Sequence, residues 1–261
     1  MPSMVDPAAS HKASARLPVW RQPAAMALGA ALAIVVAAFV PTAWVMLSGD
    51  GSPARPQARD APWDADVAAD GAVRALGLRL PGSTLADLRT LWADELQVAL
   101  MVTQGSTAAL EASVERARPG GVAGRLLVTA QAEPAQLARW QAGALRGEAT
   151  SPRTRRLTLQ PQDLAEAMGA PLTSVGFVPQ VQLDAELVRR RFGEPQQVVA
   201  ESPTREHWLY PERGLALAID ADGRELLQFV APAQFEALLR EPLLQAARRA
   251  GPQPPVRTGP G

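Results

Sequence analysis

The chain contains no cysteine and no asparagine among its 261 residues, and its single lysine is Lys12. The lack of cysteine excludes a disulfide framework, a thiol nucleophile and a cysteine-based zinc site. An excess of one charge is also lacking, because 26 Lys and Arg residues balance 26 Asp and Glu residues, and this argues against bulk nucleic-acid binding. Hydrophobic residues make up 47% of the chain, enough for one folded core or two small ones.

Charged residues are missing from the stretch between Arg21 and Asp50, where Ala24–Leu47 is an uncharged and mostly apolar run. As a helix, this run reaches about 36 Å, against about 30 Å for the hydrocarbon core of a bilayer. A cleaved signal peptide is the alternative, but its apolar region is usually only about 7–15 residues long. The sequence therefore predicts an uncleaved transmembrane helix over residues 23–47.

The basic residues flanking this helix indicate its orientation. Lys12, Arg16 and Arg21 precede it, whereas Arg55 and Arg59 follow it. Because the flank richer in Lys and Arg tends to stay in the cytoplasm, we expect a cytoplasmic N-terminus. The predicted location is the inner (cytoplasmic) membrane, as a single-pass protein with its C-terminal domain in the periplasm.

Composition divides the chain into six parts, since residues 48–66 and 251–261 are rich in Pro and Gly and lack a hydrophobic period. We expect a cytoplasmic leader (1–22), the transmembrane helix (23–47), a flexible linker (48–66), an α/β lobe (67–150), an α+β lobe with a terminal antiparallel sheet (151–250) and a disordered tail (251–261). The sequence leaves open whether the two lobes are separate or share one continuous sheet.

Apolar periods of 2 and 3.6 residues alternate after the linker. Ser83-Thr84 is predicted to cap a helix with Asp87 in the capping-box position, and Asp184 is predicted to cap another. The stretch Thr107–Arg116 is predicted to be helical, and Asp222-Gly223 predicts a hairpin between the last two strands. This mixture favours an α+β fold, with an antiparallel or mixed sheet and helices on one face.

The run Val181–Leu239 carries a family resemblance. It contains a helix ending in Phe192-Gly193-Glu194-Pro195, then Trp208-Leu209-Tyr210, Gly214-Leu215 and the Asp222-Gly223 turn. It resembles the SmpA/OmlA (BamE-like) domain of bacterial envelope lipoproteins, in which a helix closes on a Gly-x-Pro turn before a three-stranded antiparallel sheet. The resemblance implies non-enzymatic support of envelope assembly. The chain departs from that family in lacking a lipidation cysteine, and its residues 67–156 have no counterpart there.

His207 is the only histidine outside the leader, and Glu206 and Glu212 lie close to it in the sequence. A histidine beside carboxylates suggests a general base or a pH-sensitive contact. In a strand, however, Glu206 and Trp208 point away from His207, which favours a structural histidine. A single histidine without cysteine also argues against a zinc site. We therefore assign no catalytic residue, no metal ligand and no cofactor.

Two groups of residues are candidate binding surfaces. Trp208, Tyr210 and Phe229 form either an exposed aromatic surface for a partner or part of the core of the terminal sheet. Arg189-Arg190-Arg191 either contacts an anion or complements the negative end of a helix dipole.

These patterns together predict a membrane-anchored extracytoplasmic domain of the bacterial envelope that binds or scaffolds proteins without catalysis. Its predicted partners are membrane lipid, which residues 24–47 contact, and either another envelope protein or a second copy of the chain. Nucleic acid is not among the predicted partners. Two alternatives stay open, an envelope enzyme that uses His207 with nearby carboxylates and a cleaved, soluble periplasmic protein.

Overall fold

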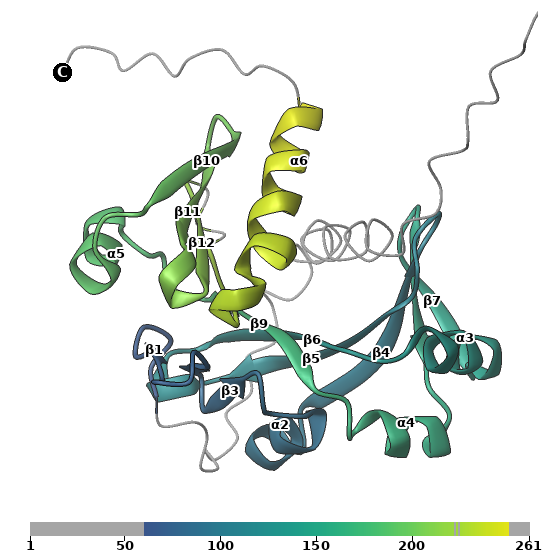
Figure 1. The fold of residues 1–261 in the computed structure, drawn as a ribbon. Helices are drawn as coiled ribbons and strands as arrows, with labels where there is room; N and C mark the ends of the chain where they lie inside the picture. The colour runs from purple at the N-terminus through teal and green to yellow at the C-terminus, as the bar shows by residue number, and fades with distance from the viewer. Residues whose placement is uncertain (1–59, 222, 224, 251–261) are drawn as a thin grey trace, which may run out of the picture.

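The computed structural model describes residues 60–221, 223 and 225–250 (Figure 1). The predicted leader, transmembrane helix and tail lie outside the described residues, as does most of the predicted linker. Among the helices of the described part, none has the length and apolar character needed to cross a membrane.

A ten-stranded antiparallel sheet organises the described residues. Its spatial order is β10-β11-β12-β13-β9-β6-β5-β4-β8-β7. The N-terminal strands of this sheet are β4 (Leu96–Thr103), β5 (Ala109–Ala117), β6 (Gly124–Ala130), β7 (Arg146–Ser151) and β8 (Thr154–Thr158). The C-terminal strands are β9 (Leu172–Pro179), β10 (Gln197–Ser202), β11 (Arg205–Tyr210), β12 (Leu215–Asp220) and β13 (Leu226–Val230). A separate three-stranded sheet is formed by β1 (Asp66–Val67), β2 (Val73–Ala75) and β3 (Leu78–Leu80).

Strand β9 joins the two halves of the large sheet. It pairs with β6 on one side, with Phe177 opposite Leu126, and with β13 on the other, with Phe177 opposite Leu227. Strands from both predicted lobes therefore share one continuous sheet, with β7 and β10 at its two edges. The pairing of each edge strand with its neighbour contains a register shift, at Ala149/Ser151 in β7 and at Ala200/Ser202 in β10.

The predicted α+β class, with helices on one face of the sheet, is wrong. The described residues are mostly β, with thirteen strands and five α-helices, and helices lie on both faces of the sheet. Part of the error lies in Thr107–Arg116, where Ala and Glu suggest a helix by propensity. Leu110, Ala112 and Val114 instead alternate with half-buried residues, so most of the stretch forms β5 with the period of a strand.

The sequence correctly predicts the N-terminal caps of two helices. Thr84 caps α2 (Leu85–Trp92), accepting a hydrogen bond from the Asp87 backbone while the Asp87 side chain accepts from the Thr84 backbone. Asp184 caps α5 (Ala185–Phe192). Both signals depend only on residues within one helical turn, which is why the sequence was enough.

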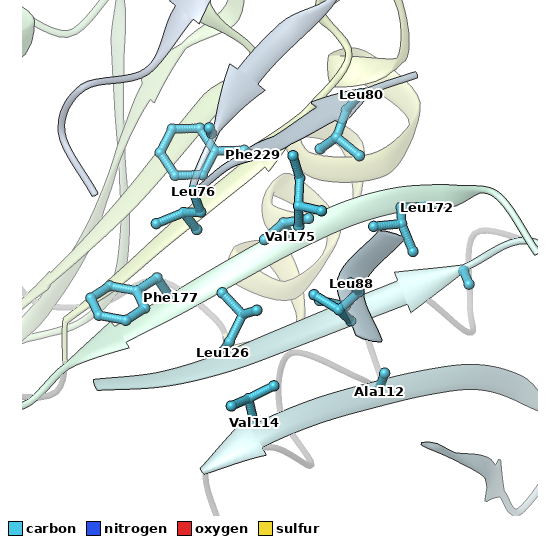
Figure 2. Close-up of a cluster of buried hydrophobic side chains, with 14 of the residues drawn as sticks. Leu76, Leu80, Leu88, Ala112, Val114, Leu126, Leu172, Val175, Phe177 and Phe229 are labelled. Atoms are coloured by element: carbon cyan, nitrogen blue, oxygen red, sulfur yellow. The ribbon is translucent and has the colours of Figure 1, made fainter. Parts of the chain in front are cut away.

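The main core lies between the sheet and the elements on one of its faces. Helices α2, α3 (Pro134–Gly143), α4 (Pro161–Ala167) and α5 all contribute apolar side chains to it, as does the three-stranded sheet. Figure 2 shows Leu126, Val175 and Phe177 of the large sheet lying close to Leu76 and Leu88 of the covering elements.

A second, smaller core lies on the opposite face, where α6 (Glu241–Ala250) stands against the C-terminal strands (Figure 1). Phe235, Leu239 and Leu243 pack there against Val199 and Leu209. A π-helical turn (Glu236–Arg240) directly precedes α6, whose second residue is Pro242. Proline has no N–H to donate within a helix, and a wider turn accommodates that missing hydrogen bond.

Candidate functional site

His207 lies in a buried polar network on the face of the sheet that α6 covers. On β11 it is opposite Val199 of β10 and Ala218 of β12, and only 4% of the residue is exposed. Its Nε2 atom is 2.7 Å from Oε2 of Glu201. The carboxylate that meets His207 therefore comes from the neighbouring strand and not from Glu206 or Glu212, the two acids that the sequence analysis had noted.

Arg205 extends this network across three strands. Its Nε lies 2.9 Å from Oε2 of Glu201, and its Nη1 donates to Oδ2 of Asp220 at 3.1 Å. Asp220, opposite Arg205 on β12, is 1% exposed. We call Glu201, Arg205, His207 and Asp220 the His207 network. The convergence of Glu201 and Asp220 depends on cross-strand register, which the sequence does not reveal; Arg205 lies two positions before His207 on β11, so strand alternation alone places it on the same face.

The electrostatics of the His207 network keep Glu201 ionised. The hydrogen bond from His207 lowers the pKa of the Glu201 carboxyl most; burial raises it, and the charges of His207 and Arg205 lower it further. The net pKa lies below the ordinary value of 4.5. A histidine bound to a paired carboxylate in this way is positioned and charge-compensated, as expected of a buried ionic network that fixes strand register. Within the described part of the chain, no cluster of three or more His, Cys, Asp or Glu residues is arranged to hold a metal ion.

The three aromatic residues that were candidates for either a surface or the core belong to the main core. Trp208, Tyr210 and Phe229 are 2%, 4% and 0% exposed. The Tyr210 hydroxyl donates to the backbone carbonyl of Gly193 at 3.1 Å, and burial raises its pKa to about 12. These residues therefore pack in the core of the terminal sheet, and they do not form an exposed surface.

The three consecutive arginines of α5 each have a contact within the chain. The Cζ of Arg189 lies 4.5 Å from the centre of the Trp208 ring, and its Nε is 3.3 Å from Glu194. Arg190 pairs with Glu186 at 3.1 Å. The Cζ of Arg191 lies 5.8 Å from the centre of the Trp63 ring. These contacts favour a role in packing α5, and the predicted anion contact remains a prediction.

A second group of polar residues lies on the N-terminal strands, on the face turned away from the main core. This face is on the same side of the sheet as the region that α6 covers. Residues that pair across successive strands lead from one region to the other, namely Ser113, Leu127, Gly176, Gln228 and Ala216. We call the following residues the outer face: Gln97, Met101, Glu111, Ser113, Glu115, Arg125, Leu127, Thr129 and Arg156. Most of them are half-buried.

Glu111 lies in the middle of the outer face. It is opposite Ala99 on β4 and Thr129 on β6. Burial raises the pKa of its carboxyl to about 7, although the charges of Arg125 and Arg156 act to lower it. Its Oε1 is inaccessible to solvent and has no hydrogen-bond partner among the described residues. The other charged groups of this face are engaged, since Arg125 pairs with Glu115 at 3.1 Å and Arg156 donates to Gln97 at 2.8 Å.

Glu111 was not a candidate from the sequence because it was assigned to a helix. The alternation of Leu110, Ala112 and Val114 around it is the signal that places it on the face opposite the core. A buried acceptor without a donor is costly when it is charged, and burial accordingly raises the pKa of the Glu111 carboxyl.

Comparisons with protein-family models, with curated proteins and with solved structures find no match to this chain. The resemblance of Val181–Leu239 to the SmpA/OmlA domain therefore remains a prediction from sequence.

Proposed function

We propose that this chain is a membrane-anchored extracytoplasmic protein of the bacterial envelope that acts by binding or scaffolding another protein, without catalysis. The anchor rests on the uncharged run Ala24–Leu47 and on the basic residues that precede it. A short linker after the anchor would hold the folded domain near the bilayer and raise its effective concentration there.

The observation that carries the binding role is the outer face of the sheet, which none of the described helices covers. Glu111 lies among Met101, Leu127 and Thr129 on this sheet face, and Arg125 and Arg156 are close enough to act on its charge. Helices α2 to α5 pack on the other side of the sheet, and α6 covers the C-terminal strands. A partner protein that packs on this face would cover the half-buried side chains that surround Glu111. The partner is another envelope protein or a second copy of this chain.

The His207 network is the specific observation behind the alternative function, an envelope enzyme. His207 and Glu201 are within hydrogen-bond distance, which a general acid or base requires. Against this, Arg205 neutralises the carboxylate and Asp220 holds Arg205 in a buried position. Because Arg205 is paired with both carboxylates, we favour the structural role.

Site-specific photo-crosslinking in cells tests the binding role. A photoreactive residue at Ser113 on the outer face is expected to give a discrete adduct, whereas the same residue at exposed Thr90 on α2 is not. An adduct of twice the chain mass identifies a second copy, and any other mass identifies a different envelope protein. Identical products from the two positions, or none from Ser113, would rule out the outer face as the binding surface.

Membrane fractionation and cysteine labelling test the anchor. The chain is expected to stay with membranes after an alkaline carbonate wash, and its release would support the cleaved, soluble alternative instead. Because the chain has no native cysteine, single cysteines at Ser10 and Ser202 report topology directly. They are expected to react with an impermeant maleimide from opposite sides of the membrane, and labelling of both from one side would refute the orientation.

A further inference from the structure

The described part of the chain contains two similar helix–strand units whose helix caps, Thr84 and Asp184, are one hundred residues apart. Helices α2 and α5 each contain eight residues, and each ends in a buried aromatic residue, Trp92 in the first and Phe192 in the second. The next strand, β4 or β10, begins within five residues of the helix end. We call residues 84–130 the first repeat and residues 184–220 the second repeat.

The two repeats also share their strand arrangement. Strands β4, β5 and β6 form an antiparallel meander in the first repeat, and β10, β11 and β12 form one in the second. Strand β9 extends the first meander and β13 the second, and these two strands pair with each other. Both α2 and α5 pack on the main-core side of the sheet. The large sheet is therefore built from two similar halves in opposite order about the β9–β13 pair.

The cross-strand pairs identify which residues of the two repeats correspond. The corresponding residues are Gln97 and Gln197, Ala99 and Val199, Glu111 and His207, Ser113 and Leu209, Leu127 and Ala216, and Thr129 and Ala218. In each of these pairs both residues point away from the main core, because side chains alternate between the two faces of a strand. Glu111 thus has the same place in the first repeat as His207 has in the second.

In the second repeat, this side of the sheet holds a helical segment of the same chain. The apolar stripe of that segment is formed by residues spaced four apart, namely Phe235, Leu239 and Leu243. Leu209 packs against this stripe, and Nε of Arg240 donates to Oε1 of Gln197 at 2.8 Å. None of the described helices takes the corresponding place on the first repeat, which is the outer face. The second repeat therefore shows how a helix is held on this side of the sheet.

The outer face is more polar than the surface under α6. Ser113 stands in place of Leu209, and Thr129 stands in place of Ala218. A stripe of large apolar side chains would cover these hydroxyl groups without offering hydrogen bonds, which is unfavourable. The charged side chains of the outer face are balanced, with two arginines and two glutamates. A matching partner surface therefore carries small and hydroxyl-bearing side chains and no excess of charge.

We propose that the outer face binds an α-helix of a different envelope protein, in the place that corresponds to that of α6 on the second repeat. The helix contacts the face through a stripe of small and hydroxyl-bearing side chains, which hydrogen-bond to Ser113 and Thr129. This inference rests on the binding role proposed above and names the form and chemistry of the partner. The α6 helix of a second copy does not fit, because its Phe and Leu side chains would cover those hydroxyl groups.

Photo-crosslinking of the full chain in cells, with mapping of the attached residues, tests the proposal. A photoreactive residue is placed in turn at Gln97, Met101 and Ser113, and mass spectrometry identifies the partner residue that each one reaches. The three positions are expected to reach one helix of one protein, at residues that are three, four, seven or eight positions apart.

The mapped positions separate failure of this inference from failure of the binding role. Attachment sites two residues apart indicate a strand, and sites within residues 235–250 indicate α6 of a second copy. Either result overturns the helix proposal while the binding role stands. The absence of adducts at all three positions overturns both.

Two substitutions at Ser113 test the chemistry of the contact. Ser113→Leu introduces the residue type that the second repeat has at this place, and it is expected to reduce the adduct from Gln97 about fivefold, the loss expected for one hydrogen bond. Ser113→Thr keeps the hydroxyl group and is expected to leave the yield unchanged. Thermal unfolding checks that the variants are folded, and Ser113→Ala provides a smaller change with the same expected loss. An undiminished adduct in both Ser113→Leu and Ser113→Ala, or an equal loss in Ser113→Thr, would overturn the proposed contact.

Discussion

At the scale of single residues, the environments of Glu111 and Glu201 shift the pKa values of their carboxyl groups in opposite directions. Burial raises the pKa of Glu111 to about 7, whereas a hydrogen bond from His207 lowers that of Glu201. Ionisation of Glu111 therefore destabilises the folded state, whereas ionisation of Glu201 stabilises it. Their contributions to stability must therefore change with pH in opposite senses.

Glu111→Gln is expected to stabilise the protein at pH 8. The folded-state pKa of about 7 lies above the ordinary 4.5, so Glu111 favours folding fully below pH 4.5 and loses that contribution as the pH rises through 7. The loss amounts to about 3 kcal/mol at most, from about 1.4 kcal/mol per pKa unit. Urea unfolding at several pH values measures it, with Glu115→Gln on the same strand as the control. An unchanged pH dependence in Glu111→Gln would contradict the prediction.

Glu201→Gln is expected to destabilise the protein at pH 7 and to have progressively less effect in acid. Because the folded-state pKa of Glu201 is lowered, its contribution is present above the ordinary value and disappears as the pH falls through the folded-state value. Thermal unfolding between pH 3 and 7 measures the difference. Glu212→Gln, which removes a carboxylate outside the network, provides the control. A constant difference across this range would show that the ion pair is unimportant.

At the scale of elements, the turn before β12 depends on one glycine. Gly214 has φ +60°, and a Cβ at this position would lie 2.0 Å from the carbonyl oxygen of Val230. Its own carbonyl accepts from the N–H of Val230 at 2.9 Å. The backbone of the last strand thus approaches this turn too closely for any side chain.

Gly214→Ala is expected to destabilise the protein much more than Gly71→Ala. Both glycines have positive φ, which costs alanine about 1–2 kcal/mol, but a Cβ at Gly71 meets nothing within 4 Å. The difference between the two variants therefore measures the contact with Val230, and we expect Gly214→Ala to cost at least twice as much. Chemical denaturation of the two variants makes the comparison, and equal losses would refute the steric argument.

The secondary-structure elements also show which features can be predicted from the sequence. The caps at Thr84 and Asp184 were predicted correctly because each signal lies within one turn. The helix predicted at Thr107–Arg116 is wrong because helix propensity was given more weight than the alternation of Leu110, Ala112 and Val114. The His207 network was found only in part, since Glu201 and Asp220 reach it from neighbouring strands. Strand order and register are tertiary properties, and a single sequence does not specify them in a form that local patterns reveal.

At the scale of the whole molecule, the position of β9 makes the two halves of the large sheet interdependent. Phe177 on β9 is fully buried and pairs across both neighbours, with Leu126 on β6 and Leu227 on β13. A change at this point removes packing from the N-terminal and the C-terminal strands together. The fold should therefore lose stability as one unit.

Phe177→Ala is expected to cost about 3–5 kcal/mol, the usual range for removing a buried phenylalanine side chain. Native-state hydrogen exchange is expected to show the same loss of protection in β4 to β6 as in β11 to β13. Val198→Ala, at a side chain that is 48% exposed, is expected to change protection by less than about 0.5 kcal/mol. Loss of protection confined to one half would show that the two halves unfold independently.

The interrupted pairing of the outermost strands has a consequence for how these molecules behave when crowded. At Ala149/Ser151 and at Ala200/Ser202 the backbone departs from regular spacing, and an incoming strand would meet donors and acceptors that are out of step. Many copies can then lie side by side without joining edge to edge into fibrils. Association between molecules then depends on side-chain contacts. Side chains can distinguish one partner from another, whereas backbone pairing of edge strands cannot.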